Sequence, residues 1–162
     1  MAKEAKTNAM RMLDRQKVKY EAFTYECDEF IDGLHSADLI GAPYDQSFKT
    51  LVMEGKSGGC YVFVVPIEKE VDREAAAKAV GEKTVDMIHV KDILKITGYV
   101  RGGCSPLGMK KLYPTVFDAS AENFDEIYVS GGRIGLTLKV NLESLLKVTN
   151  GKLADITMKQ ED

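Results

Sequence analysis

Seven consecutive residues from Cys60 to Pro66 carry almost only apolar side chains, and this run constrains the fold more than any other feature. It is far shorter than the roughly 18 apolar residues needed to cross a bilayer, and it is rich in valine and aromatic residues. A strand with this composition presents apolar side chains to both faces of its sheet. The run therefore predicts a central strand of a sheet that is covered on both sides.

The remaining elements are short and are separated by glycine-rich turns. The strand 47–53 precedes the turn 54–59 and forms a hairpin with the apolar run, and the strands 126–129 and 136–140 flank a second glycine-rich turn at 130–135. A further strand is expected at 20–25, and helices are expected at 7–16, 33–40, 73–80, 91–97 and 142–148. Because the spacing is not that of regular βαβ units, the pattern favours an α+β fold, a mixed sheet with helices packed around it.

Length and composition indicate one ordinary globular domain that spans residues 1–162. Apolar residues make up 44% of the chain and charged residues 29%, which excludes a disordered tail or a coiled-coil rod. The three cysteines are scattered and odd in number, so they form neither a disulfide framework nor a zinc site. No apolar signal segment follows the first residues, and we expect a reduced, cytoplasmic protein.

Charge is distributed unevenly along the chain. The net charge of −3 excludes a protein that is basic as a whole. Residues 3–19 hold six basic and two acidic residues, and residues 91–111 hold five and one, so each segment carries +4. Two interpretations remain open, a local positive surface or ordinary solvated lysines and arginines.

The sequence lacks the common catalytic motifs. His35 and His89 stand alone, without the spacing of a catalytic triad. No HExxH, CxxC or GxGxxG motif is present, and the turn at 131–135 lacks the Gly-Lys-Ser/Thr ending of a nucleotide-binding loop. Zinc, redox, dinucleotide and ATP chemistry are therefore not indicated.

Lys49 is the most informative charged residue. Alternation along the strand 47–53 places it on one face with Leu51 and Met53, and both faces of this strand are otherwise apolar. A lysine there either extends its ammonium group to the solvent at the edge or lies in a cleft, because an unpaired buried charge is costly. A cleft lysine could hold a phosphate or an ester carbonyl.

The segment Gly102–Gly108 cannot form regular structure and predicts a shaped loop. Its glycines leave backbone N–H groups accessible to an anion or an oxyanion, and Pro106 stiffens the loop. Cys104 is a candidate nucleophile, but no base is evident beside it, and a cysteine that only lines a pocket is the simpler interpretation.

Four segments, 47–52 (SFKTLV), 76–81 (AAKAVG), 97–108 (TGYVRGGCSPLG) and 127–132 (IYVSGG), share one resemblance. They closely resemble the YbaK/EbsC-type aminoacyl-tRNA deacylases, a group related to the editing domain of bacterial prolyl-tRNA synthetases. The segment 97–108 is the most specific, and the likeness continues in order from Lys6 to Ile156. The resemblance implies that the mixed sheet is barrel-like.

The resemblance further implies a free-standing trans-editing enzyme, a hydrolase or lyase without a cofactor or metal. Its substrate would be mischarged tRNA, contacted at the acceptor end, and cysteine on tRNA(Pro) is the ester expected first. Prolyl-tRNA synthetase is the partner protein that the resemblance suggests, whereas DNA and membranes are not implied. Cysteinyl esters need no protein nucleophile, because the thiolate of the substrate can attack its own carbonyl.

Family positions map onto particular residues of this chain. Lys49 matches the essential lysine, and the loop from Gly102 to Pro106 matches the one that lines the aminoacyl pocket. The residues expected to contact substrate are Tyr25, Phe30, Gly102, Gly103, Cys104, Ser105, Pro106 and Ser130. The turn after Ser130 departs from the family, because Ile134 and Thr137 stand where a basic residue and a carboxylate are common.

These departures leave alternatives open. The chain could be a tRNA- or synthetase-binding module without activity, a binder of small molecules or aminoacyl-adenylates, or a deacylase that uses water to remove another small amino acid. Loss of the amino acid from mischarged tRNA distinguishes the deacylases from the binding modules.

Overall fold

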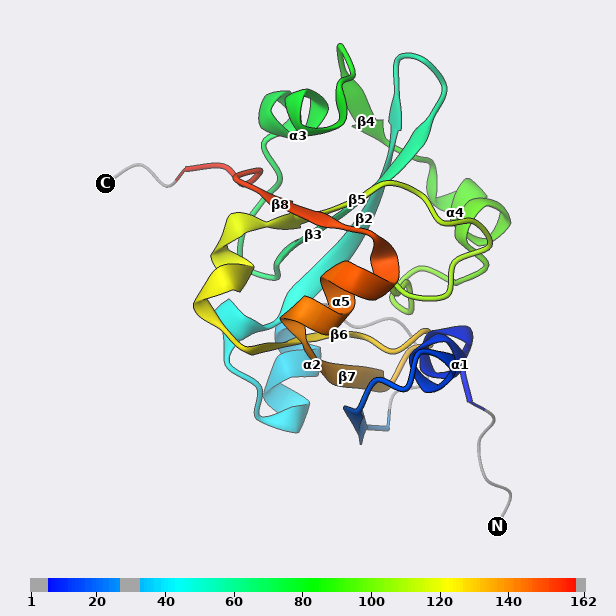
Figure 1. Ribbon diagram of the computed structural model, residues 1–162, viewed down its shortest axis with the longest axis vertical. Coiled ribbons are helices and arrows are strands. Elements are labelled where there is room, and N and C mark those ends of the chain that lie inside the picture. Colours follow the sequence, from blue (N-terminus) through cyan, green and yellow to red (C-terminus); the bar gives the residue numbers. More distant parts are fainter. Residues whose placement is uncertain (1–5, 27–32, 160–162) are drawn as a thin grey trace.

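The structure is a computed structural model that describes residues 6–26 and 33–159 (Figure 1). The helices are α1 (Asn8–Arg15), α2 (Gly33–Ile40), α3 (Arg73–Val80), α4 (Val90–Thr97) and α5 (Leu142–Thr149), with 3-10 turns η1 (Tyr44–Gln46) and η2 (Ala119–Asn123). The strands are β1 (Tyr20–Thr24), β2 (Phe48–Gly55), β3 (Cys60–Pro66), β4 (Val85–Met87), β5 (Thr115–Asp118), β6 (Glu126–Ser130), β7 (Leu136–Asn141) and β8 (Lys152–Ala154).

The strands form two sheets. The smaller sheet is antiparallel, in the order β1-β7-β6, and the larger is mixed, in the order β4-β2-β3-β5-β8. In the larger sheet β2 runs antiparallel to β3 and β4, whereas β5 runs parallel to β3 and β8. The prediction that the Cys60–Pro66 strand is central is confirmed, because β3 is the third of five strands.

The two sheets meet where an isolated bridge joins Ser47, just before β2, to Tyr128 of β6. The expected α+β fold, a mixed sheet with helices around it, is confirmed. The sheets curve toward each other without closing into a barrel, because this contact is a bridge and not a ladder. Between this bridge and the first β4 pair at Met53, the outer edge of β2 has no strand partner among the described residues.

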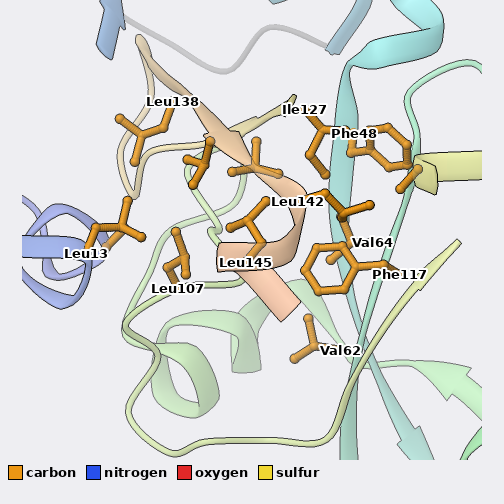
Figure 2. Close-up of a cluster of buried hydrophobic side chains, with 14 of the residues drawn as sticks. Leu13, Phe48, Val62, Val64, Leu107, Phe117, Ile127, Leu138, Leu142 and Leu145 are labelled. Atoms are coloured by element: carbon orange, nitrogen blue, oxygen red, sulfur yellow. The ribbon is translucent and has the colours of Figure 1, made fainter. Parts of the chain in front are cut away.

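The main core lies between the two sheets. Figure 2 shows Leu142 and Leu145 of α5 between Leu138 of the smaller sheet and Val64 and Phe117 of the larger one. All five side chains are buried, and burial of each contributes about 1.5–3 kcal/mol to folding. The helix α5 therefore fixes the position of one sheet relative to the other.

A second core lies on the opposite face of the larger sheet, beneath α3. Phe63 and Val65 of β3 pack there with Ala76 and Ala77. The helix starts at the Asp72 cap, whose carboxylate accepts the N–H groups of residues 74 and 75, and ends at a left-handed Gly81. Both faces of β3 are thus covered, as its composition requires. None of the described helices is long and apolar enough to cross a membrane.

Gly108 and Gly41 form a matched pair for testing how closely the chain packs. Both have a left-handed φ of 72°, but a Cβ on Gly108 would lie 2.6 Å from the carbonyl carbon of Asn8, whereas a Cβ on Gly41 meets nothing within 4 Å. We expect Gly41→Ala to cost about 1–2 kcal/mol of unfolding free energy, which is the price of the left-handed conformation alone. Gly108→Ala should cost about 1–3 kcal/mol more, because backbone must move. Chemical denaturation measures both, and equal losses would contradict the close packing.

Candidate functional site

A cleft of about 610 Å³ opens where the two sheets meet, a size typical of small-ligand sites. Its walls come from the first half of β2, from α2, from the start of α4 and from the ends of β6 and β7. The segment after α4 closes one side with Arg101, Gly102 and Cys104. Residues of two of the segments that carry the family resemblance, 47–52 and 97–108, therefore meet at one cavity.

Lys49 lies in the wall of this cleft. It is half-buried on β2, opposite Val65, on the face that also carries Leu51. Burial lowers the pKa of the Lys49 ammonium, and the negative charge of Glu70 opposes that effect. Of the two interpretations of its sequence position, the structure places Lys49 at a cleft.

The charged side chains that line the cleft are cationic in the described part of the chain, and Glu70 acts on Lys49 from outside the lining. Lys49 and Arg101 line it, and no described aspartate, glutamate or histidine does. His35 and His89 lie outside the lining, and no cluster of potential metal ligands occurs among the residues described. The cleft therefore favours an anionic or strongly polarised ligand.

The open edge of β2 brings main-chain polar groups to the cleft. Odd-numbered residues of β2 form their main-chain hydrogen bonds with β3. Two bonds at the ends of this pairing show it: Ile67 N–H donates to the Ser47 carbonyl at 2.9 Å, and Gly55 N–H donates to the Gly59 carbonyl at 2.8 Å. Even-numbered residues face the other way, as the bond from Ile88 N–H to the Val52 carbonyl confirms. The N–H and carbonyl groups of Thr50 accordingly point to the open edge.

The side chain of Thr50 adds a third polar group. Its Oγ1 is buried and has no hydrogen-bond partner in the described structure. Buried polar atoms are almost always bonded to protein, water or ligand, so the Thr50 hydroxyl is free to bond to a molecule in the cleft. Sequence analysis did not single out Thr50 or Arg101, although both lie within segments that it quoted.

The loop after α4 is held by hydrogen bonds of its own side chains. Tyr99 N–H donates to Thr97 Oγ1 at 2.9 Å, and the buried Tyr99 hydroxyl donates to the Leu107 carbonyl at 2.5 Å. Leu107 N–H donates to Ser105 Oγ at 3.2 Å, and burial raises the pKa of Tyr99, which keeps its proton in place. These bonds close residues 97–107 into a fixed shape.

The loop also contacts the β6–β7 turn through its backbone. A Cβ on Gly103 would lie 2.8 Å from the Cα of Arg133, so only glycine allows this approach. The Gly103 N–H is itself used, because it donates to the Val100 carbonyl at 2.9 Å. The N–H groups of Gly102 and Cys104 have no backbone acceptor among the described residues, and both residues line the cleft.

The loop residues expected to contact substrate divide into two groups. Gly102 and Cys104 line the cleft, whereas Gly103, Ser105 and Pro106 do not. Gly103 and Ser105 are buried in the packing of the loop, and Pro106 lines a second cavity beside α1. The loop thus separates two cavities.

Cys104 has the environment of a neutral thiol. Burial raises its pKa to about 11, and a hydrogen bond with Thr97 only partly offsets this effect. No described residue of the cleft is a histidine or carboxylate that could take its proton. The Cys104 thiol therefore lines the wall in its neutral form.

Two other expected residues also line the cleft. Tyr25 is fixed by the bond from its N–H to the Gly135 carbonyl, 3.0 Å, and Ser130 Oγ accepts the Gly132 N–H at 3.4 Å. Thr137, which stands at the departure from the family pattern, pairs with Ser130 across the smaller sheet and lines the same cleft. Phe30 lies outside the described residues.

Comparison with known proteins gives a consistent picture. A family model described as an aminoacyl-tRNA editing domain matches residues 35–148. A protein of Enterococcus faecalis, named as a candidate Cys-tRNA(Pro)/Cys-tRNA(Cys) deacylase, EbsC, is 41% identical over 158 residues, which cover 97% of this chain and 96% of that protein. The name denotes a deacylase, which is a hydrolase, and gives no support to the lyase class.

Two further similarities extend this result. A proline–tRNA ligase of Fervidobacterium nodosum is 26% identical over 77% of this chain, which spans only 21% of that protein. The crystal structure of a candidate trans-editing enzyme for prolyl tRNA synthetase superposes with a TM-score of 0.81 at 22% identity, over 96% of this chain and all of that one. The latter similarity establishes the fold.

Tyr99→Phe tests whether the loop depends on its internal bonds. The change leaves the buried Leu107 carbonyl unpaired, so we expect a loss of about 1–3 kcal/mol in unfolding free energy. Tyr61→Phe is the matched control, because Tyr61 donates to Glu82, which also accepts two bonds from Ser57. The control should lose less than about 1 kcal/mol in the same denaturation experiment. Equal stability of the two variants would show that the Tyr99 bond does not hold the loop.

Proposed function

Since the chain belongs to the aminoacyl-tRNA editing domain family, we propose that it is a trans-editing deacylase that acts in the cytoplasm on mischarged tRNA. Its substrate is the ester between a wrong amino acid, cysteine first, and the terminal ribose of tRNA(Pro). The relative from Enterococcus faecalis, whose name specifies Cys-tRNA(Pro) and Cys-tRNA(Cys), supports this choice. Prolyl-tRNA synthetase is the protein from which the enzyme would receive its tRNA.

The observation that carries the proposal is the combination of cations and uncharged polar groups in the cleft. Lys49 and Arg101 suit the phosphate and the ester of an aminoacylated nucleotide, and no histidine or carboxylate lines the described part of the cleft to act as a general base. A cleft of this kind can bind and polarise an ester but supplies no activated nucleophile of its own. The nucleophile therefore comes from the substrate.

A cysteinyl ester contains such a nucleophile. Its thiolate attacks the carbonyl carbon of the same residue, a carbon–sulfur bond forms, and the carbon–oxygen bond to the ribose breaks. The ribose oxygen leaves with a proton from solvent, and the product is a cyclic thiolactone that water then opens to free cysteine. Because the reacting atoms belong to one molecule, positioning alone gives a large effective concentration.

Lys49 would hold the terminal phosphate or the ester oxygen in register for this attack. Its charge is partly desolvated, which strengthens its interaction with a ligand that excludes water. The N–H groups of Gly102 and Cys104 would stabilise the negative charge that develops on the carbonyl oxygen. Proline lacks a thiol, so correctly charged Pro-tRNA(Pro) cannot react in this way.

Lys49→Ala should abolish deacylation and leave the fold intact, because removing a partly buried cation sacrifices charge and not packing. Lys49→Arg should also fail, since a planar guanidinium does not replace a compact ammonium in a fitted cleft. Lys56→Ala, at the exposed β2–β3 turn, is the control and should keep full activity. The assay follows the release of labelled amino acid from Cys-, Ala- and Pro-tRNA(Pro).

The same assay decides between the candidate functions. Cysteine released fastest, with Pro-tRNA(Pro) untouched, supports the proposal, whereas preferred release of alanine would require an activated water and a different mechanism. Failure of the wild-type protein to deacylate any ester would leave a binding module. Near-normal turnover by Lys49→Ala would refute the role of Lys49.

Cys104→Ser and Cys104→Ala should keep activity within about tenfold of the wild type, because the thiol is neutral and the substrate carries its own nucleophile. The measurement is kcat/KM on Cys-tRNA(Pro), together with a thermal melt to exclude unfolding. A loss of about a thousandfold in both variants, with normal melting, would instead identify Cys104 as the nucleophile.

A further inference from the structure

A second cavity, of about 410 Å³, lies on the other side of the loop, against α1. Three basic residues line it, Arg11 and Arg15 from α1 and Lys111 from the segment before β5. None of the described lining residues is acidic. We call this cavity the basic cleft, and the deacylation mechanism above does not use it.

The basic cleft joins the two positive segments of the sequence. Arg11 and Arg15 lie four residues apart, on one face of α1, within the segment 3–19, and Lys111 ends the segment 91–111. Gly108 brings the two together, because it packs against the backbone of Asn8 and its N–H contacts Met12 Sδ at 3.1 Å. Charges that are about 100 residues apart in sequence therefore face one cavity.

The carboxylate of α1 is already paired with a lysine. Asp14 accepts a hydrogen bond of 2.5 Å from Lys6. Because its charge is balanced by Lys6, Asp14 does not cancel the positive charge of Arg11 and Arg15. Arg11 donates a hydrogen bond to a neutral oxygen, that of the Asn8 side-chain amide, at 3.4 Å. The cleft thus keeps its positive potential within a protein of net charge −3.

Apolar and aromatic side chains line the basic cleft beside its three basic residues. Tyr113 lines the cleft, and its hydroxyl donates to the Ile96 carbonyl at 2.8 Å, which fixes the ring. The neighbouring Leu112 is 63% exposed. A positively charged groove with a fixed aromatic ring is the composition that proteins use to bind single-stranded nucleic acid, with cations on phosphates and rings under bases.

The two cavities are close enough for one strand to occupy both. Cys104 lines the first and Pro106 the second, so their walls are two residues, at most about 7 Å, apart along the backbone. We propose that the basic cleft binds backbone phosphates of the RNA strand just upstream of the aminoacylated nucleotide, with Arg11, Arg15 and Lys111 as the phosphate ligands. The proposal rests on the proposed function and adds a second contact surface for the same tRNA.

The test is a salt titration of binding to uncharged tRNA, which does not depend on catalysis. Each neutralised phosphate contributes about −0.7 to −0.9 to the slope of log affinity against log salt, so the three basic residues contribute about −2 to −3. The combined variant Arg11→Gln, Arg15→Gln, Lys111→Gln should lose that part of the slope and bind roughly tenfold or more weakly at low salt. Glutamine keeps helix propensity in α1, and a thermal melt checks folding.

The matched control removes the same charge elsewhere. Lys78, Lys83 and Lys159 are exposed and line neither cavity, so their combined change to glutamine should leave the slope nearly unchanged. Equal effects of the two triple variants would overturn the proposal, because only net charge would then matter. An unchanged affinity for tRNA in the first variant, with lost binding to the synthetase, would also overturn it and assign the cleft to a protein.

A minimal substrate separates this proposal from the proposed function. The cysteinyl ester of adenosine lacks upstream phosphates, so the basic-cleft variant should cleave it as fast as the wild type while its KM for Cys-tRNA(Pro) rises roughly tenfold or more. Failure of the wild type on both esters refutes the deacylase, whatever the binding result. Equal losses on both substrates would refute a phosphate-binding role for the basic cleft.

Discussion

The loop from Thr97 to Gly108 depends on two backbone contacts that leave no room for a side chain. Gly103 lies against Arg133 of the β6–β7 turn, and Gly108 lies against Asn8 at the start of α1. These contacts place the loop between the cleft that Lys49 lines and the basic cleft. The loop is further closed by the Tyr99 hydroxyl, so its shape is set before any ligand arrives.

The two cavities on either side of this loop differ in the environment of their charged groups. On one side Lys49 and Arg101 line a cavity beside Cys104, whose thiol pKa is raised by burial. On the other side basic side chains stand at a surface with solvent access. The desolvated lysine is tolerated because Glu70 and the open cleft limit the cost of its burial, and the same desolvation makes its charge effective toward a ligand.

Sequence reasoning identified most of the elements, and their caps explain why. The strand-centre position of Cys60–Pro66 followed from its apolar composition, and the helix 73–80 followed from Asp72 and Gly81 at its ends. The short strands β4, β5 and β8 were not predicted, because three or four residues carry too little periodicity to be recognised. β5 is nevertheless fully buried, since its position is decided by parallel pairing with distant β3.

The candidate site, like the fold, could be predicted from the sequence only in part. Lys49 and the glycine loop could be selected from sequence, because a lysine in an apolar strand and a cluster of glycines both violate local patterns. Thr50 could not, since a threonine suits any strand and its unpaired oxygen appears only when the partners around it are known. The basic cleft was present in the sequence only as two separate charge segments, and their meeting depends on the fold.

The open edge of β2 has a consequence for how such a chain can change over time. Main-chain groups are the same for every amino acid, so a ligand held at Thr50 by N–H and carbonyl groups is insensitive to most substitutions along that strand. Mutation can therefore alter other side chains of the lining, such as Tyr25, Ser130 and Thr137, without removing these main-chain groups. One scaffold can in this way present different side chains around the same main-chain groups.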